Sequence, residues 1–208
     1  MTYFIAVLRL AVAGLGVAAV ITSQQVTEAR GNFDPVNFFS LFTIVSTLLT
    51  VVVMLMSAGA HLSGRSQGTR LTFLRGAVTS YMVVVGIVYA ALLEPIDRAS
   101  GIPIGWENTA MHVIIPVVLA ADWMFVSDRR RLPWKRVWAF LVFPLVWTAM
   151  ALVRGATDGW VPYPFLDPAG GYAMVAAYVA LIAAGFAASA LLVILISHRR
   201  GGLVQVKP

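Results

Sequence analysis

The chain has 208 residues, of which 60% are hydrophobic and 12% charged. This balance excludes an ordinary water-soluble domain and predicts an integral membrane protein. The net charge of +6 does not indicate nucleic acid as a partner, because the basic residues gather in alternate connections between long apolar runs. The absence of cysteine excludes disulfides, thiol catalysis and cysteine metal sites.

Apolar runs near the ~20 residues needed to cross a bilayer predict six membrane spans. Each is expected to be helical, because a helix satisfies its own backbone hydrogen bonds in lipid. No connection is long enough for a second domain, so we expect one all-α transmembrane domain over residues 1–208. The predicted spans of this six-helix bundle are 2–23, 36–58, 72–93, 106–126, 134–153 and 170–197.

The charges of the connections predict the orientation. Positive charges favour the cytoplasmic side of a membrane. Eleven basic residues lie around the second and fourth connections and in the tail, against three (Arg30, Arg98 and Arg154) in the other connections. We therefore expect both termini in the cytoplasm and some attraction of the basic connections to anionic lipid heads. The eleven are Arg65, Arg70, Arg75, Arg129, Arg130, Arg131, Lys135, Arg136, Arg199, Arg200 and Lys207.

The first span has a second interpretation. Residues 1–25 also fit a cleaved signal peptide, with Arg9 as a thin basic region and residues 10–21 as the apolar stretch. Cleavage would leave five spans and agrees with the same charge pattern, so both interpretations stay open.

Hydroxyl side chains follow one face of the second span at three- and four-residue steps. Most such stripes join helices by hydrogen bonds, and that is one interpretation here. Thr43 lies eight residues past Pro35, which in a continuous helix is ~12 Å below the start. The stripe consists of Ser40, Thr43, Thr47 and Thr50.

His112 is the only histidine inside a predicted span. It lies ~9 Å down the fourth helix from Trp106, near the depth of Thr43. An ionisable residue inside a membrane is by default a functional candidate, although a single structural hydrogen bond is the alternative. Pro116, four residues later, cannot donate to the His112 carbonyl, so we expect a kink.

Arg9 and Asp122 are the other charges predicted inside the membrane. Both lie in the inner half of their spans, and an ion pair between them avoids leaving either alone in hydrocarbon. We expect this pair to be structural. A proton or ion pathway is the alternative, and the sequence offers no further buried acids to continue it.

The connection after the fifth span, over residues 160–168, is rich in proline and aromatic residues. Tryptophan and tyrosine often anchor a protein at the lipid headgroups. The alternative is a stiff lid over a cavity that opens outward.

Three segments of the chain stand out: Leu41–Ser46, Asn108–His112 with Pro116 following, and Val161–Asp167. They occur in the order and spacing found in a known family. Over most of its length, including residues 7–10, the chain resembles the androgen-induced membrane proteins and their small bacterial six-span relatives. The resemblance implies a location in a bacterial inner (plasma) membrane. The chain departs from the eukaryotic members at Ser46, where they carry an acid, and around Pro162, where the stretch is rearranged.

The resemblance implies a threonine-dependent lipid hydrolase that cleaves fatty acid esters of hydroxy fatty acids inside the membrane. The position that matches the family's threonine nucleophile is Thr43, and the one that matches its histidine is His112. A lipid or fatty acid ester is thus the expected substrate, with no cofactor and no metal.

Such chemistry needs a base for the hydroxyl, an orienting group and oxyanion donors. Neutral imidazole serves as the base, and Asn108 lies one turn before His112. Amides inside a continuous helix are already hydrogen-bonded, so we expect side chains to bind the oxyanion. The candidates for orienting or oxyanion roles are Asn37, Asn108, Tyr89, Trp160 and Tyr172.

Two other functions stay open. A non-enzymatic small membrane transporter or lipid-binding protein would use the same apolar bundle, although no paired interrupted helices mark a transporter. In the plainest alternative the polar residues only pack helices.

Overall fold

The computed structural model describes residues 2–101 and 103–199. This described part is built of helices, and it contains no β-strand. Six of its helical segments are long and apolar enough to cross a membrane, which confirms the predicted all-α, multi-pass membrane protein. These segments are Tyr3–Ala29, Phe42–Leu62, Thr69–Ala99, Trp106–Phe125, Trp134–Thr157 and Tyr172–His198.

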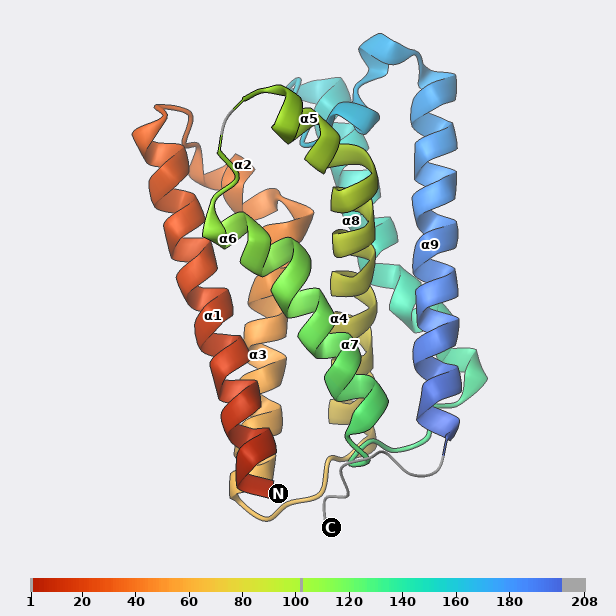
Figure 1. The fold of residues 1–208 in the computed structure, drawn as a ribbon. Helices are drawn as coiled ribbons and strands as arrows, with labels where there is room; N and C mark the ends of the chain where they lie inside the picture. The colour runs from red at the N-terminus through yellow and green to blue at the C-terminus, as the bar shows by residue number, and fades with distance from the viewer. Residues whose placement is uncertain (1, 102, 200–208) are drawn as a thin grey trace.

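The elements follow one another as a helical bundle joined by short connections (Figure 1). The α-helices are α1 (Thr2–Ala29), α2 (Pro35–Ser40), α3 (Phe42–Leu62), α4 (Thr69–Val88), α5 (Glu94–Ala99), α6 (Trp106–Thr109), α7 (Ile115–Phe125), α8 (Val137–Thr157) and α9 (Tyr172–His198). Two π-helical turns are η1 (Tyr89–Leu93) and η2 (Ala110–Ile114). Three 3₁₀ turns are η3 (Trp134–Arg136), η4 (Pro164–Leu166) and η5 (Pro168–Gly170).

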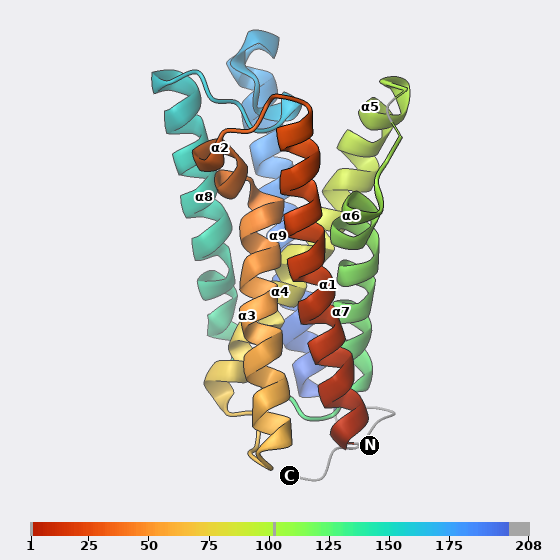
Figure 2. The ribbon, with the colours of Figure 1, turned by 90° about the vertical axis from the view of Figure 1, so that its left-hand side faces the viewer.

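Helix α4 is the centre of the bundle, since it packs against α3, α7 and α9. Helix α1 lies along α3 on one side, and α8 lies against α9 on the other (Figure 2). The start of α1 and the end of α9 lie at the same end of the bundle (Figure 1). We call this the basic end, because the connections with Arg65, Arg70 and residues 129–131 lie there, and the opposite end the acidic end.

Helices α1 and α3 approach closely at Gly16. A Cβ atom on Gly16 would lie 2.8 Å from a methyl group of Val51 and 3.4 Å from that of Thr47. The absence of a side chain at Gly16 therefore allows the backbones of α1 and α3 to approach closely. A Cβ atom on Gly14 or Gly185 would meet nothing within 4 Å. Close helix packing therefore requires glycine at position 16 and at neither of these two positions.

A buried ion-pair network joins four helices near the basic end. Arg9 of α1 donates to Asp122 of α7 and, at 2.7 Å, to Asp128 just beyond α7. Arg75 of α4 donates to the same two carboxylates, at 2.6 and 2.8 Å. All four side chains are at most 5% exposed. His61 of α3 joins them by accepting from Arg9 at Nδ1.

This network corrects two expectations. Arg75 was counted among the charges around a connection, but it is the seventh residue of α4 and is 1% exposed. The sequence also indicated no buried acid beside Asp122, whereas Asp128 is a second one. The positive charges of the two arginines balance the negative charges of the two aspartates, as we expect for a structural ion-pair cluster.

Candidate active site

The second span does not begin where the sequence predicted. Residues 36–58 were expected to form one helix, but the helix is interrupted at Leu41, whose ψ of 132° is extended. Helix α2 ends at Ser40, and α3 begins at Phe42. Thr43 is therefore in the first turn of α3, where backbone amides have no acceptor within the helix.

Both ends of α2, the short helix before the interruption, are stabilised. Asp34 caps the start of α2 by accepting from the Asn37 amide at 2.7 Å, and Pro35 occupies the first turn. At the end of α2, the indole of Trp147 on α8 donates to the Ser40 carbonyl at 2.7 Å. A carbonyl that the helix leaves unpaired is thus satisfied by a neighbouring helix.

His112 lies in the π-helical turn η2, directly before Pro116. The Ile115 amide reaches back five residues to the Ala110 carbonyl, so the wider turn accommodates the proline. The second π turn, η1, likewise precedes a proline, Pro95, and contains Tyr89. Both wide turns therefore supply side chains to the same place, since the rings of Tyr89 and His112 stack with centroids 4.1 Å apart.

Thr43 and His112 meet across the bundle. The distance from Thr43 Oγ1 to His112 Nε2 is 3.3 Å. The other ring nitrogen, Nδ1, lies 3.0 Å from the Asn108 carbonyl oxygen and 2.7 Å from the Asn108 side-chain oxygen. A backbone carbonyl only accepts, so Nδ1 carries the hydrogen and Nε2 presents a lone pair to the threonine hydroxyl.

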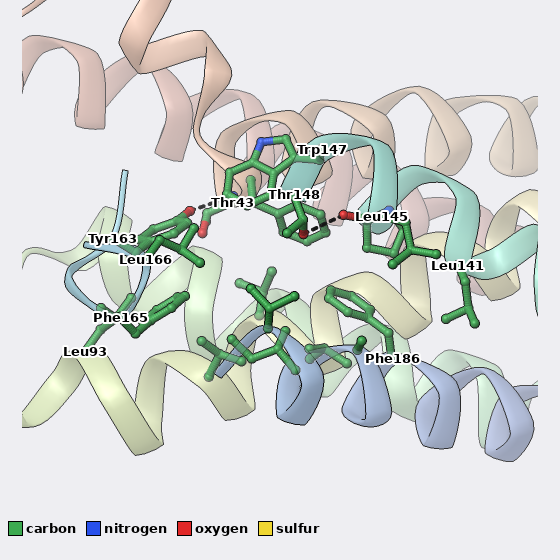
Figure 3. A pocket seen from close by; sticks show the side chains of 18 of the residues that line it. Thr43, Leu93, Leu141, Leu145, Trp147, Thr148, Tyr163, Phe165, Leu166 and Phe186 are labelled. Carbon is green, nitrogen blue, oxygen red and sulfur yellow. Dashed lines mark hydrogen bonds between the residues drawn. The ribbon is translucent and has the colours of Figure 1, made fainter. Parts of the chain in front are cut away.

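The pair faces a mainly apolar cavity of about 90 Å³ between α3, α4, α8 and α9 (Figure 3). Thr43 and Tyr163 lie toward one end of it, and Leu141, Leu145 and Phe186 toward the other. Leu145 also faces the outside of the bundle, with 51% of its surface exposed. Leu145 therefore lies both at the cavity wall and at the outer surface of α8. Its other lining residues include Val84, Val85, Val88, Pro144, Trp147, Thr148, Val179, Ile182 and Ala183.

The connection between α8 and α9 covers the cavity at the acidic end. Tyr163, Phe165 and Leu166 all line it, as the lid interpretation of this segment expected. The Thr43 amide donates to the Tyr163 hydroxyl oxygen at 3.5 Å. Because Thr43 is in the first turn of α3, its backbone amide has no acceptor within the helix, unlike the mid-helix amide that the predicted continuous span implied.

The structure places two of the five predicted accessory residues at His112 and the other three elsewhere. Asn108 and Tyr89 contact His112. Asn37 accepts a hydrogen bond from Arg154, near the end of α8. The Arg154 guanidinium lies 4.2 Å from the centre of the Trp160 ring. Asn37 and Trp160 therefore hold the end of α8 in place. Tyr172 is 78% exposed at the start of α9.

The hydroxyl stripe of the second span also separates. Thr43 faces His112, whereas Thr50 donates to the Ser46 carbonyl of its own helix and Thr47 packs at Gly16. Thr47 therefore packs between helices through its methyl group, and the hydrogen bond of Thr50 stays within α3, so neither hydroxyl joins two helices as the packing interpretation expected. No group of three or more histidine and acidic side chains in the described residues is arranged to hold a metal ion.

Fold and site together define a multi-pass membrane protein in which a threonine hydroxyl and an imidazole meet in an apolar cavity. Searches with models of known protein families, among curated proteins and among solved structures found no match to the chain.

Proposed function

We propose that the protein is a membrane-embedded lipid ester hydrolase with Thr43 as nucleophile and His112 as base. The observation that carries the proposal is the bonding distance between Thr43 Oγ1 and the unprotonated Nε2 of His112, at the wall of an apolar cavity. The resemblance of the segments around both residues to a family of threonine-dependent lipid hydrolases supports the same assignment.

In the first step the Thr43 oxygen attacks the carbonyl carbon of the ester, while its proton passes to His112 Nε2. The carbonyl π electrons move onto the carbonyl oxygen, which becomes the oxyanion. When the tetrahedral intermediate collapses, the bond to the alcohol oxygen breaks, and that oxygen takes the proton from His112. The alcohol leaves, and the acyl group remains on Thr43.

In the second step a water molecule replaces the alcohol. His112 takes a proton from the water as its oxygen attacks the acyl carbon, and then returns the proton to the departing Thr43 oxygen. The products are a free fatty acid and the original hydroxyl. Asn108 accepts from Nδ1 throughout, which keeps the ring in the tautomer that both steps need.

The cavity accounts for a lipid substrate. Leucine, valine and phenylalanine line it, and such walls bind an acyl chain by removing it from water. We infer that the ester enters sideways from the membrane past Leu145, with its carbonyl at Thr43. If the basic end lies in the cytoplasm, as the charge distribution predicts for a bacterial inner membrane, the substrate comes from the outer leaflet.

The test is hydrolysis of a long-chain fatty acid ester by purified protein in detergent. Wild type is expected to release the free acid, while Thr43→Ala and His112→Ala lose at least about 10³-fold in kcat, as hydrolases do without nucleophile or base. The matched controls are Thr50→Ala, a hydroxyl of the same helix, and His198→Ala at the basic end, which should retain activity. Equal turnover by wild type and Thr43→Ala contradicts the proposal and leaves a lipid-binding protein as the alternative.

A further inference from the structure

We propose that the Tyr163 hydroxyl is a further catalytic group, which donates a hydrogen bond to the oxyanion together with the Thr43 amide. The inference rests on the proposed hydrolase function and adds a residue to it. It also gives the connection between α8 and α9 a chemical role beyond covering the cavity.

The position of the hydroxyl is the first argument. Tyr163 lies 120 residues from Thr43 in sequence, yet its oxygen is 3.5 Å from the Thr43 amide nitrogen (Figure 3). In this contact the phenol oxygen accepts, so its own O–H group can still donate a hydrogen bond to another oxygen. Oxygen and amide therefore flank the space beside Thr43 Oγ1 in which the carbonyl oxygen of a bound ester would become negative.

The length of this contact is the second argument. At 3.5 Å it is a weak hydrogen bond, at the outer limit of useful geometry. A negatively charged oxygen forms shorter and stronger bonds to both N–H and O–H donors. The two donors would therefore exchange a weak mutual contact for two strong ones as the oxyanion forms, which stabilises the transition state more than the ground state.

The Tyr163 ring is held by aromatic neighbours. It stacks on Phe165, with the centroids 5.3 Å apart and the planes 13° apart, and it packs against Trp147 at 5.8 Å. Trp147 is itself fixed by its hydrogen bond to the Ser40 carbonyl. The residue that stabilises the interruption before Thr43 therefore also positions the tyrosine, and such preorganised donors are the effective ones.

The surroundings keep the phenol in its donor form. Burial raises the pKa of Tyr163 above its ordinary value, although contacts with Thr43 and Phe42 act in the opposite direction. The hydroxyl thus retains its proton at neutral pH. It donates a hydrogen bond without transferring the proton, so the proton balance between Thr43, His112 and the leaving alcohol is unchanged.

The decisive experiment compares Tyr163→Phe, which retains the ring and loses the hydroxyl, with wild type on a fatty acid p-nitrophenyl ester. We expect kcat to fall by about 10²-fold, the usual effect of losing one oxyanion donor, with KM within about twofold. The rate at which a fluorophosphonate labels Thr43 should fall in parallel, because that reaction passes through a similar charged oxygen. Tyr3→Phe, on an exposed tyrosine at the basic end, is the control and should match wild type.

Unchanged kcat and labelling in Tyr163→Phe overturn the proposal. A loss of kcat that is matched by an equal loss of folded protein also overturns the proposal, because the hydroxyl would then be structural. The melting temperature of the variant measures this loss. Failure of the hydrolase function itself has a different signature: wild type shows no turnover and no labelling, and Thr43→Ala is indistinguishable from it.

Discussion

Gly86 of α4 lies against the backbone of His112, so closely that a Cβ atom on Gly86 would be 2.8 Å from the His112 carbonyl oxygen. The same Cβ would lie 3.4 Å from Pro116. Pro116 has no amide hydrogen to bind that carbonyl, and the glycine allows α4 to pack directly over the wide turn. The position of the histidine therefore depends on a residue with no side chain.

We predict that Gly86→Ala displaces His112 and destabilises the protein. The added methyl group cannot be accommodated without moving one helix, at a cost of about 1–3 kcal/mol, and turnover should fall because His112 moves away from Thr43. Melting temperature and kcat in detergent measure both effects. The control is Gly185→Ala, where a Cβ meets nothing within 4 Å and stability should stay the same or rise slightly. A Gly86→Ala variant as stable and active as wild type would be incompatible with this account.

The buried network predicts a large difference between two arginine substitutions. Arg75→Gln leaves two buried carboxylates short of a partner and should lower the free energy of unfolding by about 3–5 kcal/mol. Arg98→Gln removes an arginine whose side chain is 69% exposed, and such surface ion pairs contribute little to stability. Chemical or thermal unfolding of the two variants tests this, and a similar loss in both would show that the network contributes little.

The lowered pKa of Asp128 makes the stability of the protein depend on pH. Burial alone raises the pKa of this carboxyl, but the guanidiniums of Arg75 and Arg9 outweigh it and lower the pKa from 3.8 to about 2. A carboxyl with a lowered folded-state pKa stabilises the protein above its unfolded-state pKa, and this contribution disappears as the pH falls through the folded-state value. The melting temperatures of wild type and Asp128→Asn should therefore differ most above about pH 4 and converge toward pH 2. A constant difference between pH 5 and pH 2 would contradict this.

Asn108 is predicted to position the His112 ring for the proposed reaction. Asn108→Ala removes the side-chain acceptor at 2.7 Å but keeps the backbone carbonyl at 3.0 Å, so the tautomer is retained and the ring is less firmly held. We expect kcat to fall about tenfold, which corresponds to about 1.4 kcal/mol, with KM unchanged. Asn32→Ala, at an exposed loop position, is the matched control. A variant with wild-type kcat would assign the orientation of the ring to Tyr89 and the backbone alone.

The spans were predictable because hydropathy determines which segments cross a membrane. The meeting of Arg9 with Asp122 followed from the cost of an isolated charge in hydrocarbon. The interruption at Leu41 was not predictable, since no proline or glycine marks it and the Trp147 indole that stabilises it lies 107 residues from Ser40. The backbone donor beside Thr43 was missed for the same reason.

Tyr163 was missed as a candidate for a different reason. Its segment was recognised as aromatic and proline-rich, but aromatic residues near a membrane surface usually serve as anchors. Only tertiary structure shows that its hydroxyl is directed to Thr43. Arg75 was counted with the charges around a connection although it lies within the predicted span 72–93, and the structure places it inside α4, where its side chain is buried.

The most direct test of the central claim is to identify the residue that a fluorophosphonate probe modifies. Peptide mass spectrometry of the labelled wild-type protein is predicted to find the adduct on Thr43, with the label absent from Thr43→Ala and strongly reduced in His112→Ala. The account is contradicted if wild type is not labelled, or if the adduct lies on another residue and persists in both variants.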